Sequence, residues 1–397
     1  MDILPTLTKK KYRLVSTDKP RLATVFVALY FSASPLSLIN LSGVGAAVKI
    51  FAVLALLAAF LDIRSFKITI SPLTIILHLF WLLAIISCFF TSSVSLSAQY
   101  TVTLSLNTLL VLVLGMMEDY KKTDCVILER ALLVGSWISI ILTVVFSDVS
   151  AAGRLTMRIG NSSADQNGLN GYFLIAFSFH LCSFFRKHRK IHLLFAAIPL
   201  LLGVMTGSRG GILAYLVIMA AVAFAYRKEV IRSRVLNIIA VILAVVLIYF
   251  IIKSAIPGSV LERYSSSYID QHGSAGRLET WRSLLTHYEG DNIFRLIFGH
   301  GYGTTRLYNA HNGNVAHNLY IDNLISLGIV GCVLTIVQQI VVLTVLIRSR
   351  RPTVALVYIG YIVMCLSLSL TSYLPMWNII LLTLIYDTTT LNGAKKQ

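Results

Sequence analysis

The segment Gly299–Gly328, GHGYGTTRLYNAHNGNVAHNLYIDNLISLG, differs from the rest of the chain, which is organised around it. It carries three histidines, His300, His311 and His317. It is also rich in glycine, and the pair His317-Asn318 directly precedes a long apolar run. Glycine lets a backbone approach a ligand closely or adopt a positive φ. The start of the following helix offers free N–H groups and a positive dipole end to an anion. The segment therefore suits a phosphate-bearing lipid at a membrane surface.

The overall composition indicates a membrane protein. Of the 397 residues, 56% are apolar and 13% are charged, and the mean hydropathy is +0.78. These values lie outside the usual mixture of a soluble domain. The five cysteines are scattered and show no C-x-x-C spacing, so the sequence predicts neither a zinc site nor a disulfide framework.

Apolar runs suited to cross about 30 Å of hydrocarbon, for which about 17–25 residues are needed, occur at twelve places. They lie at residues 22–40, 43–61, 70–91, 98–117, 128–147, 167–185, 191–206, 211–226, 235–253, 317–347, 353–371 and 373–387. The tenth run is long enough to begin one or two turns outside the hydrocarbon. We therefore expect an all-α, polytopic protein with about twelve transmembrane helices, forming a single integral membrane domain over residues 1–397. A large extracytoplasmic loop at residues 254–316 precedes the tenth span and is expected to carry part of the active site.

The distribution of positive charge predicts the orientation. If the N-terminus is cytoplasmic, 23 of the 34 lysines and arginines fall in segments on the cytoplasmic side and nine fall outside, as the positive-inside rule requires. Both termini are then cytoplasmic. A cleaved signal peptide is the alternative for the first span, but its removal would invert the charge pattern of every later loop. The net charge of +17 follows from these short separated clusters and does not indicate a nucleic-acid surface.

Arginine dominates the outside segments, where it supplies eight of the nine basic residues. Long loops in compact proteins are usually functional, and the arginine guanidinium matches phosphate oxygens with a fixed fork of donors. We therefore expect an anion site that faces the outer leaflet.

Two outside arginines have informative settings. Arg209 lies in TGSRGGILAYL, a glycine-flanked break between two short apolar runs, where a charge close to the membrane indicates function. The alternative is an interfacial arginine that snorkels to the headgroups. Arg277 lies in SAGRLETWRSLL, whose apolar residues recur at helical spacing and predict an amphipathic helix on the membrane. The alternative for Arg277 is a solvated charge on that helix.

A second pair of outside arginines lies in GRLTMRIGNSSADQNG. Arg154 and Arg158 are four residues apart and just precede the sixth span. We expect either of them to be a weaker substrate contact than Arg209 or Arg277.

The positions of the acidic residues indicate which classes of membrane protein are disfavoured. No aspartate or glutamate is centred in a predicted span, and the outside segments show no D-x-D pair and no clustered histidine and carboxylate ligands. Ion-coupled carriers usually need an intramembrane carboxylate, and a metal-dependent transferase needs oxygen ligands for its cation. We therefore expect no metal and no cofactor, with arginines in the role that a metal has elsewhere.

Three motifs carry a family resemblance. They are Ser208-Arg209-Gly210-Gly211, then Gly276-Arg277 with Trp281, and finally Gly301, Gly303, Ala316-His317-Asn318, Tyr320, Leu327-Gly328 and Gly331. In order, side and spacing they resemble the bacterial O-antigen ligase and polymerase superfamily of membrane glycosyltransferases, over roughly residues 150–335. The resemblance implies a fold of the GT-C-like kind, with about twelve spans and a large outside loop.

The resemblance implies that the protein transfers a glycan from an undecaprenyl diphosphate carrier to a hydroxyl on the outer face of the bacterial plasma membrane. Arg209 and Arg277, with Arg154 and Arg158 as weaker partners, would bind the diphosphate, and His317 would be the general base of an inverting reaction. The expected partners are the lipid-linked donor, a lipid-linked or lipid A core acceptor, membrane lipids and a chain-length regulator. A polymerase is favoured, with a ligase and a transporter of lipid-linked sugars as alternatives.

Several neighbours of His317 leave its role open. A histidine at a helix start also serves as a cap or a phosphate ligand, and His300 and His311 lie in the same loop. Only the resemblance ranks His317 first. Asn318 and Asp322 are four residues apart and so share one helix face. Together with His311 and Tyr302, we expect them to orient neighbours or contact the substrate.

Overall fold

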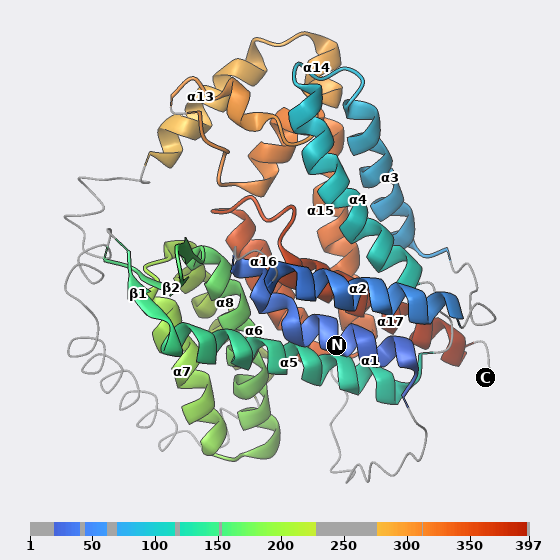
Figure 1. Cartoon of the computed structure of the whole chain (residues 1–397), viewed down its shortest axis with the longest axis vertical. Coiled ribbons are helices and arrows are strands. Elements are labelled where there is room, and N and C mark those ends of the chain that lie inside the picture. The colour runs from blue at the N-terminus through green and yellow to red at the C-terminus, as the bar shows by residue number, and fades with distance from the viewer. Residues whose placement is uncertain are drawn as a thin grey trace.

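The computed structural model describes residues 20–39, 44–61, 70–115, 120–150, 153–227, 276–311 and 313–394. Helices make up most of these residues (Figure 1). The helices of the N-terminal half are α1 (Leu22–Ala33), η1 (Ser34–Leu38), α2 (Val44–Leu61), α3 (Pro72–Ser87), α4 (Val94–Gly115), α5 (Lys122–Val145), α6 (Gln166–Lys187), α7 (Ile191–Met205) and α8 (Arg209–Ala225). Those of the C-terminal half are α13 (Arg277–Glu289), α14 (Ile293–Phe298), η3 (Thr305–Tyr308), α15 (Leu319–Arg348), α16 (Pro352–Cys365) and α17 (Leu374–Ala394).

Each predicted apolar run that the structure describes contains a helix, whereas α13, α14 and η3 lie in the predicted outside loop. The predicted span at residues 235–253 lies outside the described residues, as does the part of the predicted loop at residues 254–275. Among the described helices, four are long and apolar enough to cross a membrane: α4, α5, α6 and α15. Several further apolar helices are shorter. The protein is thus a largely helical membrane protein, while twelve crossings and their sidedness stay predictions.

Helices α6 and α16 pack on one another in the middle of the body. Helices α5 and α7 pack on α6, and α8 packs on both α6 and α16 (Figure 1). Burial on several sides explains why α6 carries few charges before its last turn. Buried tyrosines bind this centre together. The Tyr361 hydroxyl donates to the carbonyl of Gly171 at 3.0 Å, and the Tyr373 hydroxyl donates to that of Gly168 at 2.6 Å.

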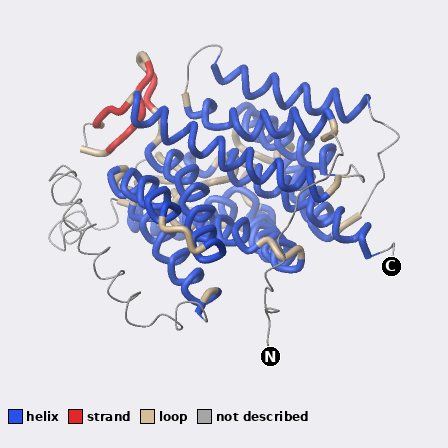
Figure 2. Tube along the Cα trace, turned by 90° about the horizontal axis from the view of Figure 1, so that it is seen from below, coloured by secondary structure: helices blue, strands red, loops and turns tan. Residues whose placement is uncertain are grey.

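A small antiparallel sheet, which the all-α prediction missed, lies at one edge of the helical body (Figure 2). Its strands are β1 (Ser147–Val149), β2 (Leu155–Ile159) and β3 (Ser162–Ser163), in the order β1-β2-β3. Ser147 pairs with Met157 and Arg158 pairs with Ser163. The hydropathy pattern gave no sign of it because the strands are short and lie in a predicted outside loop. The sheet carries Arg158, and Arg154 directly precedes β2.

Helix α15 is bent at Gly328, which has φ 66° and ψ −167°. The bend leaves the carbonyls of Ile325 and Ser326 without partners inside the helix. They accept hydrogen bonds from the N–H groups of His300, at 3.1 Å, and Gly301, at 2.9 Å. A glycine explains such a kink because only glycine adopts this conformation without strain. The first turns of α15, Leu319–Leu327, are therefore a separate piece held by the loop that follows α14.

The glycines of the deciding segment adopt positive φ as predicted. All of them except Gly313 approach other parts of the protein closely. A Cβ on Gly301 (φ 114°) would overlap the Thr91 hydroxyl, and a Cβ on Gly328 would overlap the carbonyl oxygen of Ile297. The expected close approach to a ligand is thus a close approach between the loop, the turn after α3 and helix α15.

Loops that the charge pattern places outside contact one another at one end of the body. Arg295 Nη1 donates to the Phe90 carbonyl at 2.7 Å, Arg154 Nε donates to that of Thr206 at 2.6 Å, and Asn318 Nδ2 donates to that of Leu366 at 3.2 Å. This end of the molecule carries the predicted site residues.

Candidate active site

His317 is held in an uncommon backbone conformation. Its φ is 50°, a left-handed value that side chains other than glycine and asparagine rarely adopt. The residue before it, Ala316, is fully buried and packs with Leu284 and Ile325. The Ala316 carbonyl also accepts a hydrogen bond of 2.7 Å from the Trp281 indole Nε1. The chain is therefore fixed directly before His317, whose own residue is exposed.

Asn318 fixes the chain directly after His317. It is the N-cap of α15, and its Oδ1 accepts from the N–H groups of Tyr320, at 3.0 Å, and Ile321, at 3.2 Å. Its Nδ2 donates to the Leu366 carbonyl in the loop after α16. Both ends of the Asn318 amide are thus occupied by the protein, which favours a positioning role for this side chain over a contact with sugar.

Arg277 lies at the start of α13, one turn before Trp281. Residues four apart share one face of a helix, so the face whose Trp281 holds the Ala316 carbonyl also presents Arg277 towards His317. Gly276, the N-cap of α13, is left-handed with φ 77°. The His311 Nε2 lies 3.8 Å from the position of a Cβ on Gly276. His311 is therefore a neighbour of Arg277.

The pKa of His317 lies below its ordinary value. Desolvation of the imidazole is the main cause, and the nearby Arg277 guanidinium lowers the pKa further, while the carboxylates of Asp322 and Asp165 act in the opposite direction. A neutral imidazole at neutral pH can accept a proton.

Arg154 connects the turn before α8 with the start of α6. Its Nε donates to the Thr206 carbonyl at 2.6 Å, and its Nη2 donates to Asn167 Oδ1 at 3.3 Å. Asp165, the N-cap of α6, accepts from the Gly168 N–H at 2.7 Å. Because the Asp165 charge also acts on His317, Arg154 lies in the vicinity of the candidate base.

Arg209 is the first residue of α8, directly after the N-cap Ser208, whose side chain accepts from the Gly211 N–H at 3.2 Å. A Cβ on the adjacent Gly210 would overlap the Ser367 side chain. Ser367 follows Leu366, the residue that binds Asn318. One short loop after α16 thus contacts both the start of α8 and the start of α15.

Four helix N-termini lie in this region: those of α6, α8, α13 and α15. Hydrogen bonds of Arg154 join the start of α6 to the turn before α8. The loop after α16 contacts the starts of α8 and α15. The start of α13 lies on the side of the molecule where β1, β2 and α8 are found (Figure 1). Helix N-termini carry partial positive charge and free N–H groups. They add to the positive charge of the arginines, which favours an anion in this region.

Arg158 is directed differently. Its Nε forms an ion pair of 2.7 Å with Asp148 Oδ2 on β1, and 55% of its side chain is exposed. Most of its charge is thus balanced within the sheet, and no described contact joins it to the other three arginines.

Asp322 and Tyr302 line a small cavity beside the site, together with Tyr100, Asn323 and Thr371. Tyr302 is 4% exposed, and its N–H donates to the Ser87 hydroxyl at 3.0 Å. Asp322 lies one turn after Asn318, and its charge acts on His317. These two predicted residues are brought together by the fold, at the wall next to the candidate base.

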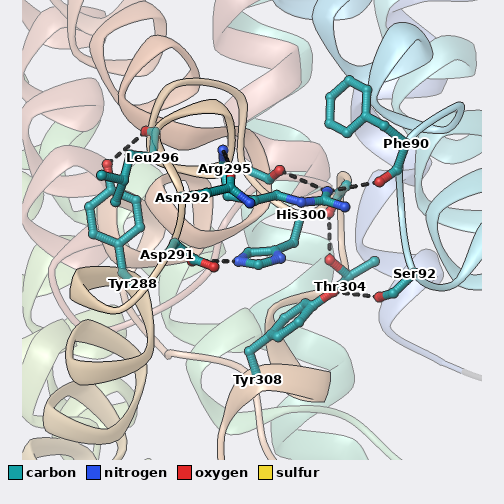
Figure 3. A network of polar contacts seen from close by, with 12 residues as sticks. Phe90, Ser92, Tyr288, Asp291, Asn292, Arg295, Leu296, His300, Thr304 and Tyr308 are labelled. Atoms are coloured by element: carbon teal, nitrogen blue, oxygen red, sulfur yellow. Dashed lines mark hydrogen bonds and ion pairs between the residues drawn. The ribbon is translucent and has the colours of Figure 1, made fainter.

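Sequence reasoning missed two features of this end of the molecule. Asp165 was not considered, although an aspartate directly before a helix is a recognisable N-cap signal. The expectation that no histidine and carboxylate groups cluster outside is also wrong. His287, Asp291 and His300 place their ligand atoms within 4.8 Å of one another. Asp291 and His300 belong to the polar network around α14 (Figure 3).

A comparison with known families finds one relevant match. A family model described as O-antigen ligase matches residues 194–336, a range that contains Arg209, Arg277, Trp281, His317 and Asp322. No curated protein matches the chain. The match supports the resemblance to the O-antigen ligase and polymerase superfamily.

Proposed function

Because the match over residues 194–336 supports membership of the O-antigen ligase and polymerase superfamily, we propose that this protein is a membrane glycosyltransferase. It polymerises undecaprenyl-diphosphate-linked oligosaccharide repeat units on the outer face of the bacterial plasma membrane, with both termini in the cytoplasm. The observation that carries the proposal is the placement of His317 near the start of α13. Trp281 of this helix holds the Ala316 carbonyl beside His317, and the Arg277 guanidinium of the same helix helps to lower the pKa of His317.

The donor is activated by its diphosphate. A hydroxyl oxygen of the acceptor attacks the anomeric carbon, a new C–O bond forms, and the bond between that carbon and the diphosphate oxygen breaks. The electron pair and the growing negative charge pass to the lipid diphosphate. Arg277 and Arg209, with Arg154 beside them, stabilise this charge in the transition state. Arg158, paired with Asp148, contributes less than the other three.

His317 accepts the proton that the acceptor hydroxyl loses. This step requires a neutral imidazole. The lowered pKa of His317 favours the neutral form at neutral pH. Trp281 and Asn318 are positioning residues, because they hold the backbone on either side of His317. Attack opposite the leaving diphosphate inverts the anomeric configuration. The arginines and helix N-termini provide the charge stabilisation, so the chemistry is proposed to proceed without a metal ion.

The description of the matching family favours a ligase as the second candidate function. The same groups would then transfer the glycan to a lipid A core hydroxyl. The test is a reaction of the purified protein with lipid-diphosphate-linked oligosaccharide, with no Mg²⁺ or Mn²⁺ added and the products sized on a gel. A ladder formed without another acceptor supports the polymerase. Product that requires lipid A core supports the ligase, and no product with either acceptor rejects both and favours transport.

A further inference from the structure

The cluster of His287, Asp291 and His300 has the composition of a metal site. His287 lies in the last turn of α13. Asp291, in the turn before α14, lies beside His300, in the loop after α14 (Figure 3). One atom of each, an imidazole nitrogen or a carboxylate oxygen, lies within 4.8 Å of the others. His300 Nε2 already lies 2.7 Å from Asp291 Oδ2.

The third member of the cluster has spare binding capacity. The Nε2 of His287 is buried and has no hydrogen-bond partner in the part of the chain that the structure describes. A buried polar nitrogen without a partner costs free energy, and its position among two other ligand groups indicates what would satisfy it.

Aromatic packing holds the two imidazoles in place. The Tyr308 ring stacks on His287 at 4.8 Å between ring centroids and lies 4.0 Å from His300. The Tyr308 hydroxyl is hydrogen-bonded to the Ser92 side chain. Arg295, a cation on the adjacent helix α14, donates from its Nη1 to the carbonyls of Phe90 and Gly299. Its charge is therefore directed towards backbone oxygens.

We propose that His287, Asp291 and His300 bind one Zn²⁺ ion, which clamps the C-terminal end of α13 to the loop after α14. Two imidazoles and one carboxylate suit zinc, whereas Mg²⁺ and Ca²⁺ prefer oxygen ligands. A water molecule completes a tetrahedral set. Tetrahedral ligand atoms around zinc are separated by about 3.3 Å for bonds of about 2.0–2.1 Å, so small side-chain rotations suffice.

The site is separate from the proposed glycosyl transfer. His287 follows Arg277 by ten residues of helix, which corresponds to about 15 Å along α13. The ion would not contact the diphosphate. It would instead fix the helix that presents Arg277 and Trp281, at the end opposite to these residues.

The test is zinc binding to the whole protein in detergent, purified with a tag other than polyhistidine and stripped with a chelator. Titration calorimetry with Zn²⁺ should give one site per chain, and Zn²⁺ should raise the thermal unfolding midpoint because it binds only the folded state. His287→Ala, which removes the unpartnered ligand, and Asp291→Ala should each weaken binding at least about tenfold and abolish the thermal shift. The control is His188→Asn, which removes a histidine at the C-terminal end of α6, outside the proposed zinc site. This variant should bind zinc like the wild type.

Two results would overturn the site. One is a wild-type protein that binds no zinc, and the other is a folded His287→Ala variant that binds zinc as tightly as His188→Asn does. These readouts do not depend on glycosyl transfer. Failure of the zinc site therefore leaves the proposed function intact, and the reverse also holds.

Discussion

The Trp281 indole Nε1 lies 2.7 Å from the carbonyl oxygen of Ala316, so a helix from one part of the outside loop holds the residue directly before the candidate base. The same helix face carries Arg277. The proposed base and its neighbouring positive charge are therefore positioned by one helix.

Trp281→Phe tests this positioning. Phenylalanine keeps most of the ring packing but loses the hydrogen bond, so the backbone before His317 gains freedom. We expect kcat to fall by roughly 10- to 100-fold, because a small misplacement of a catalytic group slows the reaction by such a factor. KM for the donor should change by less than about twofold. The matched control is Trp137→Phe, which removes an indole hydrogen bond to His180 elsewhere. Equal loss of kcat in both variants would assign the effect to general destabilisation.

The pH dependence of kcat tests the electrostatic environment of His317. As the pH falls through the lowered pKa, the imidazole becomes protonated and can no longer accept a proton, so activity should fall with a midpoint below the ordinary value of about 6.5. Arg277→Gln removes a charge that lowers this pKa, so the midpoint of the residual activity should move to higher pH. Asp322→Asn should move it to lower pH. An unchanged midpoint in both variants would show that another group titrates.

Arg209 is expected to bind diphosphate through the fork of its guanidinium. Arg209→Lys keeps the charge but loses the paired donors, so we expect KM for the donor to rise roughly tenfold, and Arg209→Ala should abolish product. Arg186→Lys is the control, since Arg186 donates to Thr353 at the other end of the body. Wild-type kinetics in Arg209→Lys would show that only the positive charge of Arg209 matters, and not its paired donors.

The kink at Gly328 provides a test of stability. Gly328 and Gly313 both have φ 66°, but a Cβ on Gly328 would overlap the Ile297 carbonyl, whereas a Cβ on Gly313 would meet nothing within 4 Å. Gly313→Ala should cost about 1–2 kcal/mol from the left-handed conformation alone. Gly328→Ala should cost more and lower the thermal unfolding midpoint further. Equal midpoints would mean that α15 tolerates a shift at its kink.

Local patterns predicted much of the fold. The hydropathy pattern predicted helices in the apolar runs, and each run that the structure describes contains one. The helical spacing around Trp281 predicted α13. Burial along a helix repeats with a short period, so these features are visible in a short stretch of sequence. The small sheet was missed because its strands are too short to show a period.

Contacts between distant segments could not be predicted in the same way. The sequence gives no signal that Gly301 packs against Thr91, or that Asp165 acts on His317 across about 150 residues of chain. The spacing of His287, Asp291 and His300 also differs from the common zinc-ligand spacings C-x2-4-C and H-x3-5-H. The family resemblance, and not the local pattern, ranked His317 above His300 and His311. The structure separates two of these histidines: His300 is paired with Asp291, whereas the Arg277 charge helps to lower the pKa of His317.

The central claim is that His317 is the general base, and a single-turnover reaction with lipid-linked oligosaccharide tests it most directly. His317 and His188 have nearly the same left-handed φ, 50° and 52°, and asparagine tolerates this conformation. His317→Asn should therefore fold normally and lose at least about 100-fold in the rate of glycosyl transfer. His188→Asn should react at the wild-type rate. A folded His317→Asn variant that transfers glycan as fast as His188→Asn would contradict the account.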